Sequence, residues 1–266
     1  MLGAIAGDVI GSPYEFDNIR TEDFPLFRDD CQITDDSIIT IAVADTLLAG
    51  DADYVRRFHE YVAKYPNPKG AYGGSFASWA HRRDSKPYNS WGNGSAMRVS
   101  PAGWALDSLE KVLAEAKRSA EVTHNHPQGI RGAQATAGAV FVARTTHDMN
   151  AVRELVQKRF EYPLNASVEE LRRTYEFDDS CQGTVPVAVT AFLESTGFED
   201  AIRKAVSVGG DSDTIACITG GIAEAYYDGV PGHIAKPILD TYLDKQLRDV
   251  VSRFVERCNV PMLRDI

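Results

Sequence analysis

Two short runs of acidic and hydroxyl side chains stand directly before apolar segments of helical periodicity. Residues 34–37 read Thr-Asp-Asp-Ser and precede the apolar run 38–48, while residues 209–214 read Gly-Gly-Asp-Ser-Asp-Thr and precede 215–227. Such side chains accept hydrogen bonds from free helix N–H groups, so a helix cap explains each run taken alone. One residue suffices for a cap, however, and adjacent carboxylates repel each other unless a cation lies between them.

The two runs together indicate a metal site. They lie about 175 residues apart, and the glycines of the second run allow close approach of its backbone to another group. If the runs face each other, they supply four carboxylates and two threonine hydroxyls, an all-oxygen set suited to one or two Mg²⁺ or Mn²⁺ ions. Neither run contains His or Cys, so a zinc site is not expected. The residues concerned are Thr34, Asp35, Asp36, Asp211, Asp213 and Thr214.

Three further segments carry weaker signals. In residues 7–15 the glycines are typical of helix packing, Asp8 of a structural hydrogen-bond acceptor, and the role of Glu15 is open. The Gly-Asn-Gly-Ser run that begins at residue 92 offers backbone N–H groups for an anion, although an ordinary turn has the same composition. In residues 123–127, two histidines stand close together, and either packed histidines or a site fits this pattern.

Trp91 precedes this run in a loop of small polar residues. A buried core position is the simple alternative, because large aromatic side chains are mostly buried. The small polar neighbours favour a wall of a ligand site instead.

The elements that position these residues are expected to be helices. Apolar residues recur at helical spacing in nine stretches, and no segment alternates like a strand with hairpin turns. The sequence therefore predicts an all-α fold, with glycine and polar residues concentrated in loops at 7–15, 29–37, 66–75, 84–101, 123–132 and 207–214. The predicted helices are 36–49, 53–64, 106–120, 130–145, 151–160, 185–195, 199–206, 214–227 and 234–256, the last interrupted near Pro237.

The chain has 266 residues, 28 Lys and Arg against 38 Asp and Glu, and a net charge of −10. An apolar content of 44% fits a globular protein, and the acid excess argues against a broad nucleic-acid surface. No run reaches the roughly 18 apolar residues of a membrane helix. Four scattered cysteines are typical of buried thiols in a reducing compartment. We expect a single domain over residues 1–266 in a cytoplasmic protein without membrane association.

Taken in order, these motifs resemble those of the ADP-ribosylglycohydrolases, a family that includes dinitrogenase-reductase-activating glycohydrolase and the ADP-ribosylhydrolases. The resemblance extends from the first residues to about residue 228 and rests on the five segments described above. One departure is Glu224, which stands where the family often has glycine. The family fold is a compact all-α domain around a binuclear metal centre, so the resemblance agrees with the periodicity.

The resemblance implies the role of each candidate. Thr34, Asp35 and Asp36 would bind two divalent cations, Mg²⁺ or Mn²⁺, from one side, and Asp211, Asp213 and Thr214 from the other. Asp211 would orient or deprotonate a water, and Glu15 matches a glutamate that gates the metal site. The ligand-binding positions implied are Gly73, Gly74, Ser90, Trp91, Gly92, Asn93 and His124.

The reaction implied is hydrolysis of the bond between the distal ribose of ADP-ribose and an acceptor, either a protein side chain or a small O-linked ester. Family members act on arginine, serine or ester linkages, and the residues do not select among these. Two other functions stay open: a metal-dependent nucleotide phosphohydrolase, and a non-catalytic protein like the lens crystallin that resembles this family. All four ligand aspartates are present, which argues against the second alternative.

Overall fold

The computed structural model describes residues 1–84 and 86–261, and all regular secondary structure in them is helical. The β-pairing in these residues consists of two isolated bridges, between Thr34 and Lys69 and between Gly92 and Ser180. The all-α prediction is therefore confirmed. Within the described part of the chain, no helix is long and apolar enough to cross a membrane.

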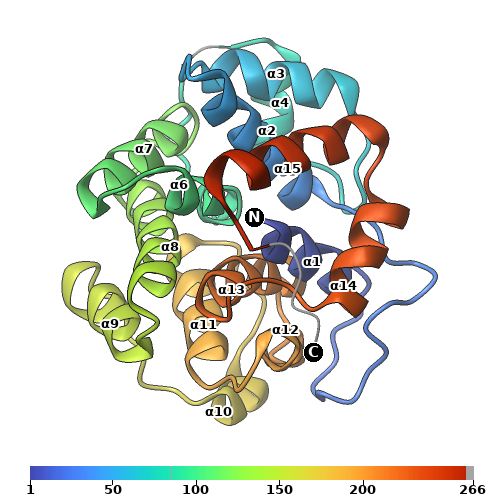
Figure 1. The fold of residues 1–266 in the computed structure, drawn as a ribbon, viewed down its shortest axis with the longest axis vertical. Helices are drawn as coiled ribbons and strands as arrows, with labels where there is room; N and C mark the ends of the chain where they lie inside the picture. The colour runs from blue at the N-terminus through green and yellow to red at the C-terminus, as the bar shows by residue number, and fades with distance from the viewer. Residues whose placement is uncertain (85, 262–266) are drawn as a thin grey trace.

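Fifteen α-helices and two π-helical turns follow one another in the described chain (Figure 1). The α-helices are α1 (Leu2–Gly11), α2 (Asp35–Ala49), α3 (Tyr54–Lys64), α4 (Gly74–His81), α5 (Gly94–Met97), α6 (Ser100–Ala105), α7 (Leu109–Glu121), α8 (Pro127–Thr146), α9 (Met149–Glu154), α10 (Val168–Thr174), α11 (Cys181–Leu193), α12 (Phe198–Ser207), α13 (Ser212–Tyr226), α14 (Gly232–Pro237) and α15 (Lys245–Cys258). The π-helical turns are Leu155–Arg159 and Ile238–Tyr242.

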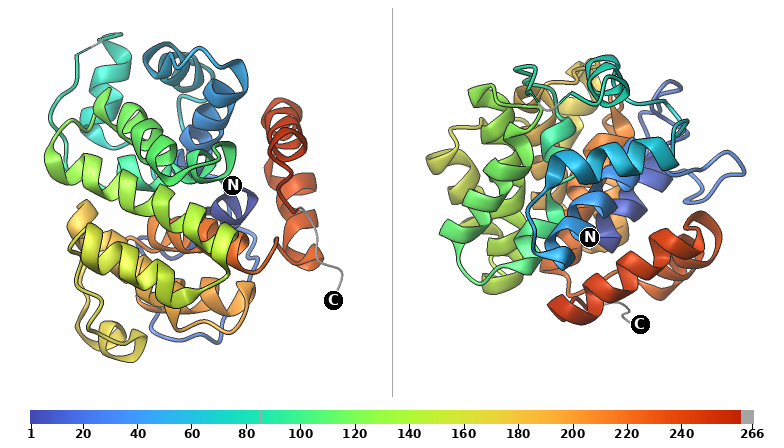
Figure 2. Two further views of the ribbon diagram at one scale, coloured as in Figure 1. Left: turned by 60° about the vertical axis from the view of Figure 1, so that its left-hand side comes forward. Right: turned by 90° about the horizontal axis from the view of Figure 1, so that it is seen from above.

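Helices α1 and α13 form the centre of the molecule, with the other helices around them (Figures 1 and 2). Every residue of α1 is buried, and so is α13 apart from Tyr226. Glycines at four-residue intervals in α1 let the two backbones touch. A Cβ at Gly7 would lie 2.0 Å from the Ala216 carbonyl oxygen, and one at Gly11 would lie 2.6 Å from the Asp213 Cα atom. The helix-packing interpretation of these glycines is confirmed, and the contact brings α1 beside the start of α13.

Some predicted boundaries were wrong. Residues 7–11 belong to α1 and not to a loop, because a helix buried on all sides shows no amphipathic pattern. The short helices α4, α5, α6 and α10 were missed; α5 lies within the predicted loop 84–101, and α4 and α6 each overlap a predicted loop at their first two residues. The C-terminal helical segment breaks at Leu243 and Asp244, where Asp244 caps α15, and a π-helical turn follows Pro237.

Glu224 on α13 closes the N-terminal end of α1. Its Oε1 accepts a hydrogen bond from the Leu2 backbone N–H at 3.1 Å, and its Oε2 contacts the amino group of Met1. Both partners are fully buried. The departure from glycine at this position thus affects helix packing and leaves the start of α13 unchanged.

Candidate metal centre and ligand cavity

A cavity of about 310 Å³ opens over the N-terminal ends of α2, α4, α5 and α13. Its volume lies at the lower end of the range of ligand pockets. One part of its wall is acidic and contains Glu15, Asp35, Asp36, Asp211 and Asp213. Glycine-rich backbone, aromatic rings, Arg98 and His124 complete the wall. The two acidic runs, far apart in sequence, therefore share one site.

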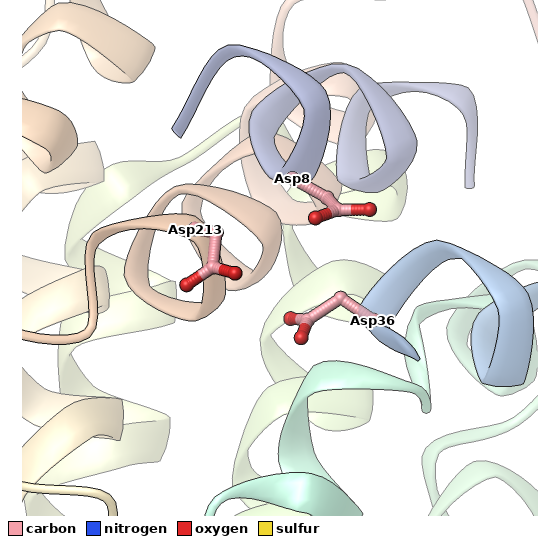
Figure 3. Close-up of side chains that lie close together, drawn as sticks. All are labelled: Asp8, Asp36 and Asp213. Atoms are coloured by element: carbon pink, nitrogen blue, oxygen red, sulfur yellow. The ribbon is translucent and has the colours of Figure 1, made fainter. Parts of the chain in front are cut away.

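Three aspartates from three helices meet at the base of this site. Figure 3 shows Asp8 on α1, Asp36 on α2 and Asp213 on α13 with their carboxylates directed toward one another. Each offers an oxygen that lies within 4.8 Å of the others, and all three are buried. Such a group of buried carboxylates has the donor atoms that hard divalent cations prefer.

A second acidic group shares one of these residues. Glu15, Asp211 and Asp213 also have carboxylate oxygens within 4.8 Å of one another. Asp213 belongs to both groups, so the two groups of carboxylates adjoin each other. Asp35 lines the cavity beside them but belongs to neither group.

The buried carboxylates of the first group lie among like charges. Asp36 Oδ1 is buried and has no hydrogen-bond partner among the residues that the structure describes. Burial, followed by the charges of neighbouring carboxylates, raises the pKa of both Asp36 and Asp213 well above the usual range. An unpartnered buried carboxylate oxygen among like charges fits a Mg²⁺ or Mn²⁺ ligand set.

Asp8 organises the start of α2. Its carboxylate accepts hydrogen bonds from the backbone N–H groups of Thr34 and Ser37, both at 3.1 Å, and from both of their hydroxyls. Burial raises the pKa of Asp8 to about 6, and these bonds act in the opposite direction. The expected role of Asp8 as a structural acceptor is confirmed, and sequence reasoning did not place it beside the metal candidates.

Thr34 serves as the cap of α2. Its Oγ1 accepts a hydrogen bond from the Asp36 backbone N–H at 3.1 Å, and no such cap bond involves the Asp35 side chain in the described structure. Burial, followed by the charges of Asp8, Asp211 and Glu15, raises the pKa of Asp35 well above its usual range. The two aspartates are therefore not needed to cap the helix.

Asp211 is held by an amide. Asn93 Nδ2 donates to Asp211 Oδ2 at 2.6 Å and to Thr184 Oγ1 at 3.0 Å. This contact joins α13 to the loop before α5 and fixes the direction of one carboxylate oxygen. Asn93 was expected to bind the ligand, and it lines the cavity, but its amide N–H groups face Asp211 and Thr184.

Glu15 lies on a long loop that the rest of the chain restrains. Asn18 accepts a hydrogen bond from the Gly210 N–H at 2.8 Å and donates one to the Gly210 carbonyl oxygen at 2.9 Å. Gly210 has a positive φ of 72°, and a Cβ there would lie 2.5 Å from a Tyr175 ring carbon, so a glycine is required. Burial, followed by the charges of Asp211 and Asp8, raises the pKa of Glu15 to about 7.

The other predicted ligand-binding residues divide into two groups. The cavity is lined by Gly73, Gly74, Ser90, Gly92, Asn93 and His124. Trp91 is not among the lining residues; its side chain is 52% exposed and packs 5.5 Å, centroid to centroid, from the His126 ring. The core alternative for Trp91 is thus wrong. Sequence reasoning missed the aromatic lining residues Tyr72, Phe76, Tyr88 and Phe177.

The histidine pair of residues 123–127 separates into two roles. His126 caps α8, since its Nδ1 accepts a hydrogen bond from the Gln128 N–H at 3.1 Å. His124 is buried, lines the cavity, and has its Nδ1 atom 2.8 Å from the Thr123 hydroxyl. A cap and a cavity residue stand two positions apart.

Comparison with known proteins shows the family and the fold. The family model described as ADP-ribosylglycohydrolase matches residues 1–263. The chain belongs to the ADP-ribosylglycohydrolase family. A solved structure, an ADP-ribosylglycohydrolase-related protein complex, has the same fold, with a TM-score of 0.73 and 22% identity over 97% of each chain.

Three matching proteins are between 26% and 33% identical to this chain. ADP-ribosylhydrolase ARH3 of Danio rerio is 26% identical over 87% of this chain and 83% of its own length. ADP-ribosyl-[dinitrogen reductase] glycohydrolase of Rhodospirillum rubrum is 26% identical over 93% of this chain and 91% of its own. An uncharacterized protein of Archaeoglobus fulgidus is 33% identical, but the match spans 52% of this chain and 50% of that one.

Proposed function

We propose that this ADP-ribosylglycohydrolase family member is a hydrolase dependent on divalent cations that releases ADP-ribose from an acceptor. The observation that carries the proposal is that two clusters of three carboxylates, which share Asp213, lie at one side of the cavity. Relatives named as ADP-ribosylhydrolase and ADP-ribosyl-[dinitrogen reductase] glycohydrolase support the reaction class.

The residues that would hold two cations are Asp36 and Asp213 at one position, with Asp8 behind them, and Glu15, Asp211 and Asp213 at the other. Thr34, Asp35 and Thr214 lie beside these groups. A bound Mg²⁺ or Mn²⁺ supplies Lewis acidity, which polarises oxygen ligands and stabilises developing negative charge. Asp8 would keep the start of α2 in place through its four hydrogen bonds.

Two carboxylates are placed to move a proton. Asp211 lines the cavity and has one oxygen fixed by Asn93, so its carboxylate would orient a water molecule in the cavity. In the protein without a cation, burial and the charges of Asp211 and Asp8 raise the pKa of Glu15 to about 7, so the carboxyl exchanges a proton close to neutral pH. A bound cation would lower this pKa. As the bond at the anomeric carbon breaks, positive charge develops on the ribose, and the surrounding carboxylates stabilise it.

The wall away from the carboxylates is suited to an anionic ligand. This wall is lined by Gly73, Gly74, Gly94, Arg98 and His124, in a chain whose net charge is −10. The N–H groups of Gly92 and Asn93 already donate to Ser90 Oγ and to the Asp179 carbonyl oxygen. Backbone dipoles and a buried cation explain how an acidic protein can accommodate a diphosphate.

The test is a panel of arginine-, serine- and ester-linked ADP-ribose substrates, assayed with Mg²⁺ and with Mn²⁺ and followed by chromatography of the products. Release of free ADP-ribose from one linkage, abolished by a chelator and restored by the cation, is the expected result. Release of inorganic phosphate from a nucleotide would identify a phosphohydrolase instead. No turnover of any substrate, with ADP-ribose still bound, would indicate a binding protein.

A further inference from the structure

Arg98 on the wall of the cavity is a buried cation that has no counterion in the described structure. The side chain is fully buried, and its Nη2 donates to the Ser119 carbonyl oxygen at 2.7 Å and to Thr123 Oγ1 at 3.0 Å. The guanidinium lies over the Phe58 ring, 4.7 Å from its centroid. Burial lowers the pKa of Arg98 to about 10, so the group stays charged near neutral pH.

The hydroxyl of Thr123 connects this cation to His124. An arginine can only donate, so Thr123 Oγ1 is the acceptor in the contact with Arg98. Thr123 Oγ1 keeps its own proton and a second lone pair, and His124 Nδ1 lies 2.8 Å away, so either atom is the donor in this contact, depending on the tautomer of His124. A proton donated to Nδ1 requires that this nitrogen be unprotonated.

His124 is neutral in this setting. The ring is buried, and burial together with the charge of Arg98 lowers its pKa well below the usual value. A neutral imidazole carries one N–H, so an unprotonated Nδ1 leaves the proton on Nε2.

The Nε2 edge of the ring faces the glycine turn of the cavity. A Cβ atom at Gly94 would lie 3.2 Å from Nε2, and one at Gly92 would lie 3.7 Å away. Both glycines and His124 line the cavity. The absence of side chains at these two positions keeps the Nε2 edge accessible from the cavity.

We infer that Arg98 and Thr123 are positioning residues that fix His124 as a neutral Nε2–H donor for the anionic part of the ligand. Three contacts carry the inference: Arg98 can only donate, its charge favours a Thr123 hydroxyl proton that points away from it toward Nδ1, and the second ring nitrogen faces the cavity. The identity of the ligand rests on the proposed function, with the ADP-ribose diphosphate as the anion, whereas the tautomer of His124 is a property of the free protein.

The tautomer is measured on the full chain labelled with ¹⁵N-histidine, by long-range ¹H–¹⁵N correlation, with His124→Gln used to assign the signals. The expected result is an unprotonated Nδ1 and a protonated Nε2. Thr123→Val removes the relay at nearly constant volume and should give a mixture of tautomers, whereas Thr123→Ser should keep the wild-type signal. Ser119→Ala is the matched control, because Ser119 binds Arg98 through its backbone carbonyl oxygen and its hydroxyl has no hydrogen-bond partner in the described part of the chain.

Calorimetric titration with ADP-ribose gives the functional half of the test. Thr123→Val is expected to weaken binding about 10-fold, the lower end for loss of a hydrogen bond to a charged group, with Ser119→Ala unchanged. A proton on Nδ1 in the wild-type protein overturns the inference, as does a Thr123→Val variant with the wild-type tautomer. If ADP-ribose does not bind the wild-type protein, the proposed function fails, and the tautomer measurement still decides the roles of Arg98 and Thr123.

Discussion

The hydroxyl of Thr214 donates a hydrogen bond to Asp36 Oδ2 at 3.3 Å, so the first turns of α13 and α2 are in direct contact. The two residues are 178 positions apart in sequence. Since α1 packs against α13 through its glycines, Asp8 reaches the same point and supports α2 from the other side. Three central helices thus converge on one cluster of carboxylates, and the stability of that cluster depends on its charge.

The first prediction concerns pH and metal. Burial and like charges raise the pKa of Glu15 from 4.5 to about 7, so the folded protein holds a proton that the unfolded chain releases. The stabilising effect of this proton is complete below pH 4.5 and is lost as the pH rises toward 7. In EDTA, the melting temperature of the wild-type protein should therefore decrease relative to that of Glu15→Gln as the pH rises from about 5 to about 7. With saturating Mg²⁺ or Mn²⁺ the wild-type melting temperature should rise at pH 7.

Both halves of this prediction can fail separately. A difference between wild type and Glu15→Gln that stays constant across this pH range would contradict the raised pKa. A melting temperature at pH 7 that neither cation changes would contradict the metal centre. Hydrolysis that continues after exhaustive chelation would contradict it as well.

The second prediction separates ligand carboxylates from helix caps. Thr34 caps α2, so Asp35→Ala should leave the fold intact and, by removing a repulsive charge, keep or raise the stability of the metal-free protein. If Asp35 belongs to the metal centre, the Asp35→Ala substitution should also lower kcat by orders of magnitude. Asp53→Ala is the control, because Asp53 caps α3 by accepting from the Arg56 N–H. That variant should lose about 1 kcal/mol of stability and keep its activity.

A stable Asp35→Ala variant with wild-type turnover would leave Asp35 without a role in the metal centre. Chemical denaturation in EDTA and a steady-state assay give the two readouts.

The sequence predicted the helical class and the residues of the cluster because their signals are local. Adjacent aspartates before an apolar helix are visible in a short window, and so is a glycine pair that must take positive φ, as Gly209 and Gly210 do. The expectation that the two runs face each other followed from their shared chemistry and from the family resemblance. Their assignment as metal ligands stays a prediction.

What could not be predicted depends on contacts between distant residues. The helix Leu2–Gly11 has no polar face, so its pattern gives no helical periodicity. Asp8 and Asn18 act through partners on other elements, and nothing near them in the sequence distinguishes them from ordinary polar residues. Phe177 lies in a loop that reaches the cavity only because α10 and α11 place it there.

The third prediction concerns the loop that carries Glu15. Asn18→Ala removes both hydrogen bonds to Gly210, so the loop should become less restrained and kcat should fall by about 10-fold, while stability changes by about 1 kcal/mol or less. Asp17→Ala, an exposed neighbour on the same loop, is the control and should keep wild-type turnover. Asn18 Nδ2 also donates to the Tyr14 and Glu15 carbonyl oxygens, at 2.6 and 3.1 Å, so equal effects of the two substitutions would show that Asn18 does not position Glu15.

The last prediction concerns the aromatic wall. Phe177 is 56% exposed and lines the cavity, whereas Phe16 is 77% exposed and is not a lining residue. Stacking of a base on an exposed aromatic ring contributes on the order of 1–3 kcal/mol, so Phe177→Ala should weaken ADP-ribose binding roughly 5- to 150-fold. Phe16→Ala should bind normally, and neither variant should lose the ~3–5 kcal/mol expected when a core aromatic is removed. Trp91 is also exposed but does not line the cavity, so Trp91→Ala tests whether the ligand lies against Trp91, as the sequence predicted, or against Phe177. If Trp91→Ala weakens binding and Phe177→Ala does not, the ligand lies against Trp91; calorimetric titration of the three variants, with a melting curve for each, decides between the two walls.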